Sequence, residues 1–261
     1  MGNAPTWTDR SVEIAGTKLH LTRAGKGAPL LVLHHDIGTL DRLPLYDELA
    51  HSFDVIVPHF PGWGKSSRPE WMRSVRDIAI MKQALLMELG IEKCNLLGLG
   101  FGGWVAAEMA TMSQKAIGKL ALVGPMGVKP EAEEEYILDQ AIVSYIDYPQ
   151  AFFHDKAAFT ERYGNVSVDQ LEAWDIAREM CFRVAWKPYM YSQTLPHLLA
   201  NARVPALIVW GEHDKIVPVS TAKQWQARMP NARLEIVKGS GHAVDMEKPA
   251  ELAKILGGFL K

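Results

Sequence analysis

The sequence predicts an α/β protein in which a mostly parallel, doubly wound sheet is interrupted by one long helical insertion. Short apolar runs and amphipathic stretches alternate along most of the 261 residues, as strands and helices do when helices cover both faces of a parallel sheet. The segment 128–203 breaks this alternation, because it has helical and aromatic patterns but no strand pattern.

The predicted strands come first as a hairpin and then as separate buried runs. Segments 11–15 and 18–23 alternate apolar and polar residues around a short turn containing Gly16, which is typical of antiparallel pairing. Most of the later runs are rich in Leu, Ile and Val and are bounded by turn residues, as expected of strands covered on both faces. These runs are 29–34, 53–58, 94–99, 119–123, 205–210 and 233–237.

The predicted core helices lie between these strands. Their apolar residues recur with a spacing close to the helical period of 3.6. The stretches are 40–51, 72–89, 101–113, 220–229 and 248–260.

The insertion is predicted to be a helical cap that follows the sixth strand. A segment of this length needs structure of its own, and we expect it to cover the carboxyl ends of the strands, where open α/β sheets bind ligands. The chain then divides into core 1–127, cap 128–203 and core 204–261. We expect most of the cap's aromatic residues to pack it onto the sheet, and we assign Tyr145 and Trp186, together with His35, to substrate binding.

Composition narrows the classes of partner. The formal net charge of −2 gives no basic face for nucleic acid, and the apolar runs are too short to cross a bilayer. Cys94 and Cys181 match no metal or redox spacing, so we expect reduced, buried thiols in a cytoplasmic protein without a signal peptide. The first six residues fit a loose myristoylation pattern, which we regard as chance. We expect a small-molecule ligand and no cofactor, and oligomeric state stays open, a homodimer included.

The strongest local signal is the stretch 95–104 (NLLGLGFGGW), in which an apolar strand enters a glycine-rich turn and then a helix. This is the arrangement of a nucleophile elbow, G-x-S-x-G. Its flanking glycines allow strand and helix to pass closely, and its central residue adopts a strained conformation. Here the central residue is Gly100.

Four further stretches complete a resemblance that covers nearly the whole chain. The sequence resembles the α/β-hydrolase superfamily, and within it the capped carbon–carbon and ester hydrolases that include the meta-cleavage-product hydrolases. His35 replaces the first glycine of the family's H-G-x-x-G loop, and His59 replaces the aspartate of its D-x-P-G-x-G-x-S loop. The matching stretches are 33–38, 59–66, 210–218 and 239–249, in addition to 95–104.

The resemblance implies a role for several residues. Asp214 would orient the histidine, His242 would be the general base, and the backbone N–H groups of Phe101 and Asp36 would form the oxyanion hole. The alternatives are purely structural roles, in which Asp214 caps a turn and His242 is a loop histidine with its hydrogen bonds satisfied. The matching contexts favour the catalytic roles.

The histidines near the pocket also suggest a metal. His34, His35, His59 and Asp36 are ligand types, but their spacing fits no standard site and their positions are explained by the loops. We therefore expect no metal.

Glycine at the elbow excludes covalent catalysis through this position, because Gly100 has no atom that can attack. Four alternatives remain open: His242 activates a water; His242 acts directly on substrate, as in a lyase or a cofactor-free oxygenase; the chain binds a ligand without turnover; or the glycine is an engineered knockout of a serine hydrolase. A natural glycine is favoured, since it removes the conformational cost of positive φ, about 1–3 kcal/mol.

Overall fold

The computed structural model describes residues 4–261 and forms one eight-stranded sheet, in the order β1-β2-β4-β3-β5-β6-β7-β8. The first two strands form the predicted hairpin, β2 also pairs antiparallel with β4, and every other neighbouring pair is parallel. The predicted fold class is therefore confirmed. The first three residues of the myristoylation pattern lie outside the described residues. The strands are β1 (Thr8–Ile14), β2 (Thr17–Ala24), β3 (Ala28–Leu33), β4 (Phe53–Pro58), β5 (Cys94–Leu99), β6 (Ile117–Val123), β7 (Ala206–Gly211) and β8 (Ala232–Val237).

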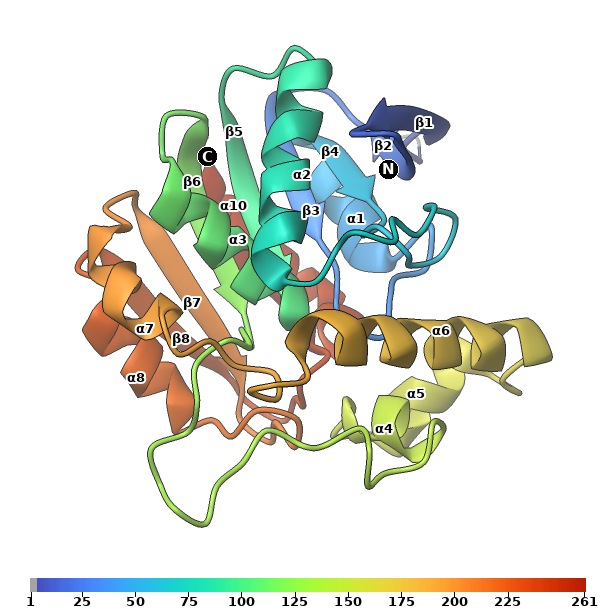
Figure 1. Cartoon of the computed structure of the whole chain (residues 1–261), viewed down its shortest axis with the longest axis vertical. Helices are drawn as coiled ribbons and strands as arrows, with labels where there is room; N and C mark the ends of the chain where they lie inside the picture. Colours follow the sequence, from blue (N-terminus) through green and yellow to red (C-terminus); the bar gives the residue numbers. More distant parts are fainter. Residues whose placement is uncertain (1–3) are drawn as a thin grey trace.

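Helices cover both faces of the sheet. The first and last helices pack against each other on one face, and α2 and α3 pack together on the other (Figure 1). All five predicted core helices are present: α1 (Pro44–Ala50), α2 (Val75–Glu88), α3 (Phe101–Met112), α8 (Thr221–Arg228) and α10 (Pro249–Leu260).

Two helices begin later than their apolar spacing predicts, and each has a local cause. Leu43 is extended, as the residue before a proline usually is, so α1 starts at Pro44. Ser74 and Asp77 form a reciprocal capping box, which fixes the start of α2 after Ser74.

The segment between β6 and β7 contains helices and no strand of the sheet. Figure 1 shows α6 lying across one end of the sheet, with α4 and α5 beside it. We retain the boundaries of the cap, 128–203, as a proposal and call this segment the insertion. Its helices are α4 (Asp147–Ala151), α5 (Lys156–Tyr163), α6 (Val168–Ala185) and α7 (Leu195–Leu198), followed by a 3₁₀ turn at Leu199–Asn201.

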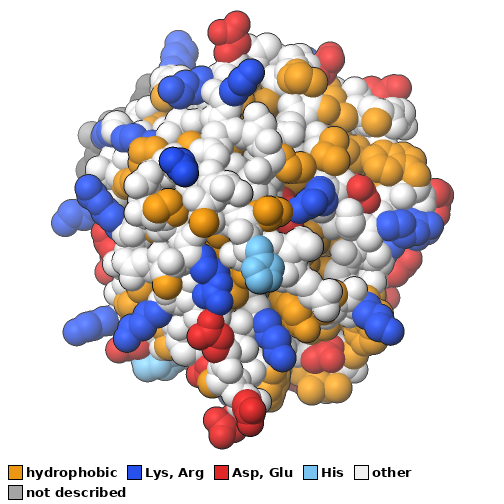
Figure 2. Space-filling view, turned by 60° about the vertical axis from the view of Figure 1, so that its left-hand side comes forward, with side chains coloured by type: hydrophobic (Ala, Val, Ile, Leu, Met, Phe, Trp, Pro, Cys, Tyr) orange, Lys and Arg blue, Asp and Glu red, His pale blue; other side chains and the backbone are white. Residues whose placement is uncertain are grey.

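Both cysteines are buried and free. On the face drawn in Figure 2, Lys and Arg side chains are interspersed with Asp and Glu and with apolar groups, so charge is not sorted by sign there. None of the helices in residues 4–261 combines the length and apolarity needed to cross a membrane.

Candidate active site

The elbow has the geometry that its glycines predict. Gly100 joins β5 to α3 with φ of +52° and ψ of −112°, a conformation that favours glycine over any side-chain-bearing residue. A β-carbon on Gly98 would lie 2.5 Å from the carbonyl oxygen of Gly102, and one on Gly102 would lie 2.1 Å from that of Leu33. Strand and helix therefore pass too closely for side chains at these positions.

His242 and Asp214 are brought together beside this elbow. Nδ1 of His242 lies 2.7 Å from Oδ2 of Asp214, and both side chains are fully buried. The other carboxylate oxygen of Asp214 accepts the backbone N–H groups of Ile216 and Val217 at 2.8 and 2.9 Å. Asp214 thus caps its own turn and also orients the imidazole of His242, so both roles considered for this residue are compatible.

The charges around His242 favour its protonated form. Burial alone would lower the pKa of His242, but the charge and hydrogen bond of Asp214, together with the more distant Asp36 and Asp245, outweigh burial and raise that pKa above its ordinary value. The imidazole is therefore poised to hold a proton that it has taken up.

Two imidazoles occupy the place where a nucleophile's side chain would stand. A β-carbon built on Gly100 would lie 2.5 Å from Nδ1 of His35 and 2.7 Å from Nε2 of His242, closer than real β-carbons approach other atoms. Neither nitrogen has a hydrogen-bond partner within residues 4–261. A serine at position 100 would therefore require His35 to move, which argues against a knockout made by changing a serine alone.

His35 has a carboxylate partner that the sequence did not reveal. Its Nε2 lies 2.9 Å from Oδ1 of Asp245, and both side chains are buried. Phe152 from the insertion packs edge-on against the imidazoles of His35 and His242, with centroids 5.3 and 4.8 Å away. Asp245 was missed because its partner is distant in the chain and no spacing rule links them.

The two predicted oxyanion-hole residues directly follow Gly100 and His35 in the sequence. Phe101 directly follows Gly100 and opens α3, where backbone N–H groups have no partner within the helix. Asp36 directly follows His35, whose ring reaches Gly100. Phe101 is therefore at the elbow, and the role of both backbone N–H groups as donors stays a prediction.

The side chain of Asp36 ties the insertion to the core. Its Oδ2 accepts hydrogen bonds from the hydroxyl of Tyr148 at 2.8 Å and from Nε2 of Gln140 at 2.7 Å. Burial raises the pKa of Asp36, although His242 and the Tyr148 hydrogen bond oppose that rise. Sequence reasoning gave no role to Tyr148 or Gln140, since nothing in the insertion marks which polar groups reach the core.

The two aromatic residues assigned to substrate binding lie in different surroundings. Tyr145 lines a cavity of about 10 Å³ together with Asp36 and Tyr148. Trp186 is half exposed, and its ring packs against Phe182 and Tyr189. The structure thus places Tyr145 near Asp36, while Trp186 contacts other aromatic residues of the insertion. Both substrate roles stay predictions.

A second link between insertion and core is the carboxylate of Glu247, in the short helix α9 (Val244–Glu247) after His242. It accepts the backbone N–H groups of His154 and Asp155, each at 2.8 Å, from the insertion. It also accepts the N–H of Gly241 at 2.5 Å and the hydroxyl of Ser240 at 3.1 Å, from the histidine loop. One carboxylate therefore joins the loop that carries His242 to the insertion.

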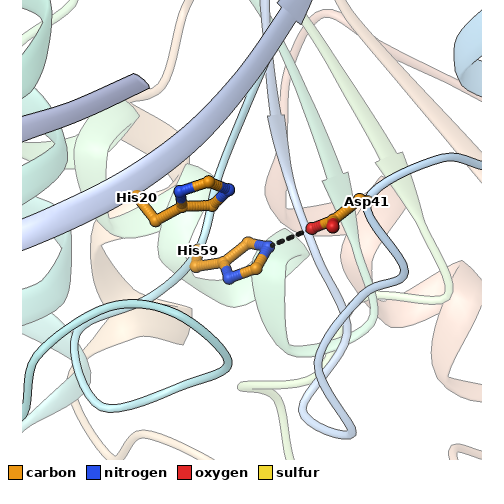
Figure 3. A group of neighbouring side chains, drawn as sticks. All are labelled: His20, Asp41 and His59. Atoms are coloured by element: carbon orange, nitrogen blue, oxygen red, sulfur yellow. Dashed lines mark ion pairs between the residues drawn. The ribbon is translucent and has the colours of Figure 1, made fainter. Parts of the chain in front are cut away.

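A separate histidine cluster lies around Asp41. One ligand-type atom from each of His20, Asp41 and His59 lies within 4.8 Å of the others (Figure 3). Nδ1 of His59 accepts the backbone N–H of Lys65 at 3.0 Å, so a neutral His59 carries its proton on Nε2, which faces Asp41 at 3.5 Å. The ammonium of Lys65 holds the other oxygen of Asp41 at 2.5 Å. This arrangement is an ion-pair network, and His59 offers no lone pair to a metal.

Comparison with known proteins places these features in a family. The chain matches the family model described as alpha/beta hydrolase fold over residues 29–249. It is 27% identical to a 2-hydroxy-6-oxononadienedioate/2-hydroxy-6-oxononatrienedioate hydrolase of Paraburkholderia phymatum, over 94% of this chain and 92% of that protein. It is 28% identical to an uncharacterised protein of Mycobacterium tuberculosis, over 98% of this chain and 81% of that protein.

Solved structures agree on the fold. A meta-cleavage product hydrolase from Pseudomonas fluorescens superposes with a TM-score of 0.81 at 20% identity, covering 96% of each chain. A serine hydrolase involved in carbazole degradation superposes with a TM-score of 0.78 at 20% identity, covering 98% of this chain and 99% of that one. From the family match and its agreement with the observed sheet, the chain belongs to the alpha/beta hydrolase fold family.

Proposed function

We propose that the protein hydrolyses a small, partly apolar carbonyl compound, at an ester or a C–C bond, with His242 and Asp214 activating a water. The observation that carries this proposal is Nε2 of His242, which is fully buried, faces the elbow at Gly100 and has no hydrogen-bond partner among the described residues. A buried imidazole nitrogen of this kind needs a partner, and a water can supply it.

The proposed reaction needs no covalent intermediate. Neutral His242 takes a proton from the water while the water oxygen attacks the carbonyl carbon, and Asp214 stabilises the imidazolium. The backbone N–H groups of Phe101 and Asp36 would receive the oxyanion. His242 then returns the proton to the leaving group. Without a nucleophile we expect slow turnover, on the order of 10³–10⁴ over water.

The substrate class is supported by the relatives and by the insertion. The relative from Paraburkholderia phymatum is named as a hydrolase of a carbonyl compound, a hydroxy-oxo dienedioate. On the insertion, an apolar groove of about 440 Å³ is lined by Tyr136, Ile142 and Tyr189, among others. The hydroxyl of Tyr189 accepts the backbone N–H of Gln140, whose side chain holds Asp36. Since His242 is fully buried, we expect substrate to enter when the insertion shifts.

The same burial favours a second candidate, which is ligand binding without turnover. A buried site that contains His35 and His242 is also suited to hold a ligand without converting it. The two candidates differ in whether product forms.

The deciding measurement is hydrolysis of p-nitrophenyl butyrate by the protein and by His242→Ala. We expect His242→Ala to lower kcat/KM by roughly 10²–10⁴-fold, the range of general acid–base catalysis. The matched control is His51→Ala, an exposed histidine on α1's carboxyl end, which should leave the rate unchanged. Equal rates for the protein and His242→Ala would refute the role of His242 and leave ligand binding as the better candidate.

A further inference from the structure

Two histidine–carboxylate pairs meet at one point above Gly100. A carboxylate only accepts hydrogen bonds, so Asp214 fixes the proton of neutral His242 on Nδ1 and Asp245 fixes that of neutral His35 on Nε2. Each imidazole therefore presents its remaining nitrogen, a lone pair when neutral, to the elbow. The two pairs have the same design, although His35 alone comes from the N-terminal part of the chain and the other three residues come from the C-terminal part.

The two free nitrogens are close enough to act on one molecule. Nδ1 of His35 and Nε2 of His242 lie 2.5 and 2.7 Å from the place that a β-carbon on Gly100 would take. The two nitrogens are therefore at most about 5.2 Å apart. Neither nitrogen bonds the other. One water with ordinary hydrogen bonds of about 2.8 Å spans such a gap.

The buried carboxylates of Asp214 and Asp245 favour one proton on the two imidazoles. Asp214 and Asp245 are each fully or almost fully buried, so two neutral imidazoles would leave two carboxylates without a cation in a dry site, which is costly. One proton on the pair removes part of that cost. A second proton would place two cations face to face.

We propose that His35 and Asp245 are a second acid–base pair of this site, and that the imidazoles of His35 and His242 share one proton while acting on a common water. This proposal rests on the proposed hydrolysis and deepens it, because it gives the base a partner acid. It also explains the residue at position 100, since only glycine leaves room for the ring of His35.

The reaction balances with these groups alone. The neutral imidazole accepts a proton from water as the water oxygen forms a bond to the carbonyl carbon and the carbonyl electron pair moves to its oxygen. The protonated imidazole then gives its proton to the leaving oxygen as the bond from that oxygen to carbon breaks. The products are an acid and an alcohol, and one proton remains on the pair, now on the other imidazole.

Other titratable groups face this pair from the elements packed around it. Asp36 faces His35 and His242 from the core, with Tyr148 of the insertion on its carboxyl group, while His34 lies next to His35. Tyr46 and Tyr163 approach Asp245. None of these groups bonds the two free nitrogens.

The kinetic test is the pH profile of kcat/KM for phenyl butyrate, whose leaving group gains from protonation. We expect a bell-shaped profile, with one limb for gain of a second proton and one for loss of the shared proton. His35→Gln should lower kcat by roughly 10²–10⁴-fold with little change in KM, and should leave a one-sided profile.

A matched control separates chemistry from packing. His34→Gln changes the neighbouring buried histidine, whose two ring nitrogens are both bonded to backbone groups, so it should keep the bell shape even if stability falls. A bell-shaped profile and unchanged kcat in His35→Gln, alongside activity that depends on His242, would overturn this proposal and leave the proposed function standing.

A second readout does not depend on turnover. In ¹⁵N-histidine-labelled protein, a shared proton predicts that the ring signals of His35 and His242 shift together in one titration step, and that Asp245→Asn separates them. Titration of His242 alone, with His35 unmoved in that step, would overturn the proposal even if no ester is hydrolysed.

Discussion

Two histidine clusters contain the same residue types and differ in the surroundings of their ring nitrogens. Over Gly100, His35 and His242 each bind a carboxylate through one nitrogen and turn the other, unbonded, to a common point. Around Asp41, the second nitrogen of His59 is occupied by the backbone of Lys65, and the Lys65 ammonium binds the carboxylate.

The difference teaches that a histidine cluster is judged by what its unbonded nitrogens face and not by the number of histidines. Nε2 of His59 also makes no hydrogen bond, but it faces the carboxylate of Asp41 at 3.5 Å within an ion-pair network. A buried ring with one lone pair left over, such as His242, is available for chemistry. Three predictions test this contrast.

The largest expected effect comes from restoring a serine. Gly100→Ser alone should gain less than about 10-fold in kcat/KM, because His35 occupies the serine's space. Combined with His35→Gly it should gain roughly 10³-fold or more, since a serine supplies most of a triad's power. Asp245→Asn completes this combined variant, so that no carboxylate is left buried without its donor.

The measurement is hydrolysis of p-nitrophenyl butyrate, with a burst of p-nitrophenol as the sign of an acyl-enzyme. Full recovery by Gly100→Ser alone would show that His35 does not limit the space at the elbow, and the contrast between the two clusters would lose its main support.

The next effect is on stability, and it compares the two carboxylates. Asp245→Ala should cost roughly 2–5 kcal/mol of unfolding free energy, because it leaves the buried N–H of His35 unpaired. Asp41→Ala should cost less than about 1 kcal/mol, because that side chain is about two-fifths exposed and its ion pair is screened. Urea denaturation at neutral pH measures both, and similar losses would contradict the distinction.

The smallest effect concerns Lys82, a fully buried lysine whose Nζ donates to the carbonyl oxygen of His59 at 2.7 Å. Burial lowers the pKa of Lys82 to about 7. Between that value and the ordinary 10.5 the unfolded chain binds more protons, so burying this lysine costs stability that is regained as pH rises.

Lys82→Met should therefore be more stable than the protein by roughly 1–4 kcal/mol at and below pH 7, with the gain fading toward pH 10.5. Urea denaturation across this range measures it. The control is Lys65→Met, whose lysine is more than half exposed and paired with Asp41, so no such gain is expected. A gain independent of pH would show that packing alone favours methionine.

Most of the fold could be predicted from the sequence, because strand and helix patterns are local. β5 and the start of α3 lie where the apolar run and the glycines place them. Boundaries set by a single residue, such as Pro44, were less accurate, because spacing does not register a proline's effect on its neighbour.

The site was predictable in part. The motifs indicated Asp214 and His242, which the structure brings within 2.7 Å. The pairing of His35 with Asp245 depends on how two distant loops meet in space. The ring of His35 fills the space that a side chain at position 100 would need. No pattern along the chain expresses this contact.

The carboxylate of Glu247 connects the insertion, which covers the site, to the loop that positions His242. It holds His154 and Asp155 on one side and the loop before His242 on the other. An insertion that lifts away from the sheet at this point must either break these bonds or carry the loop with it. Entry of a ligand would then disturb the imidazole that is to act on it, and closure would restore both together. His242 would be correctly placed only while the insertion covers the site. Water and solutes that enter the open form would then meet an imidazole that is not positioned to react.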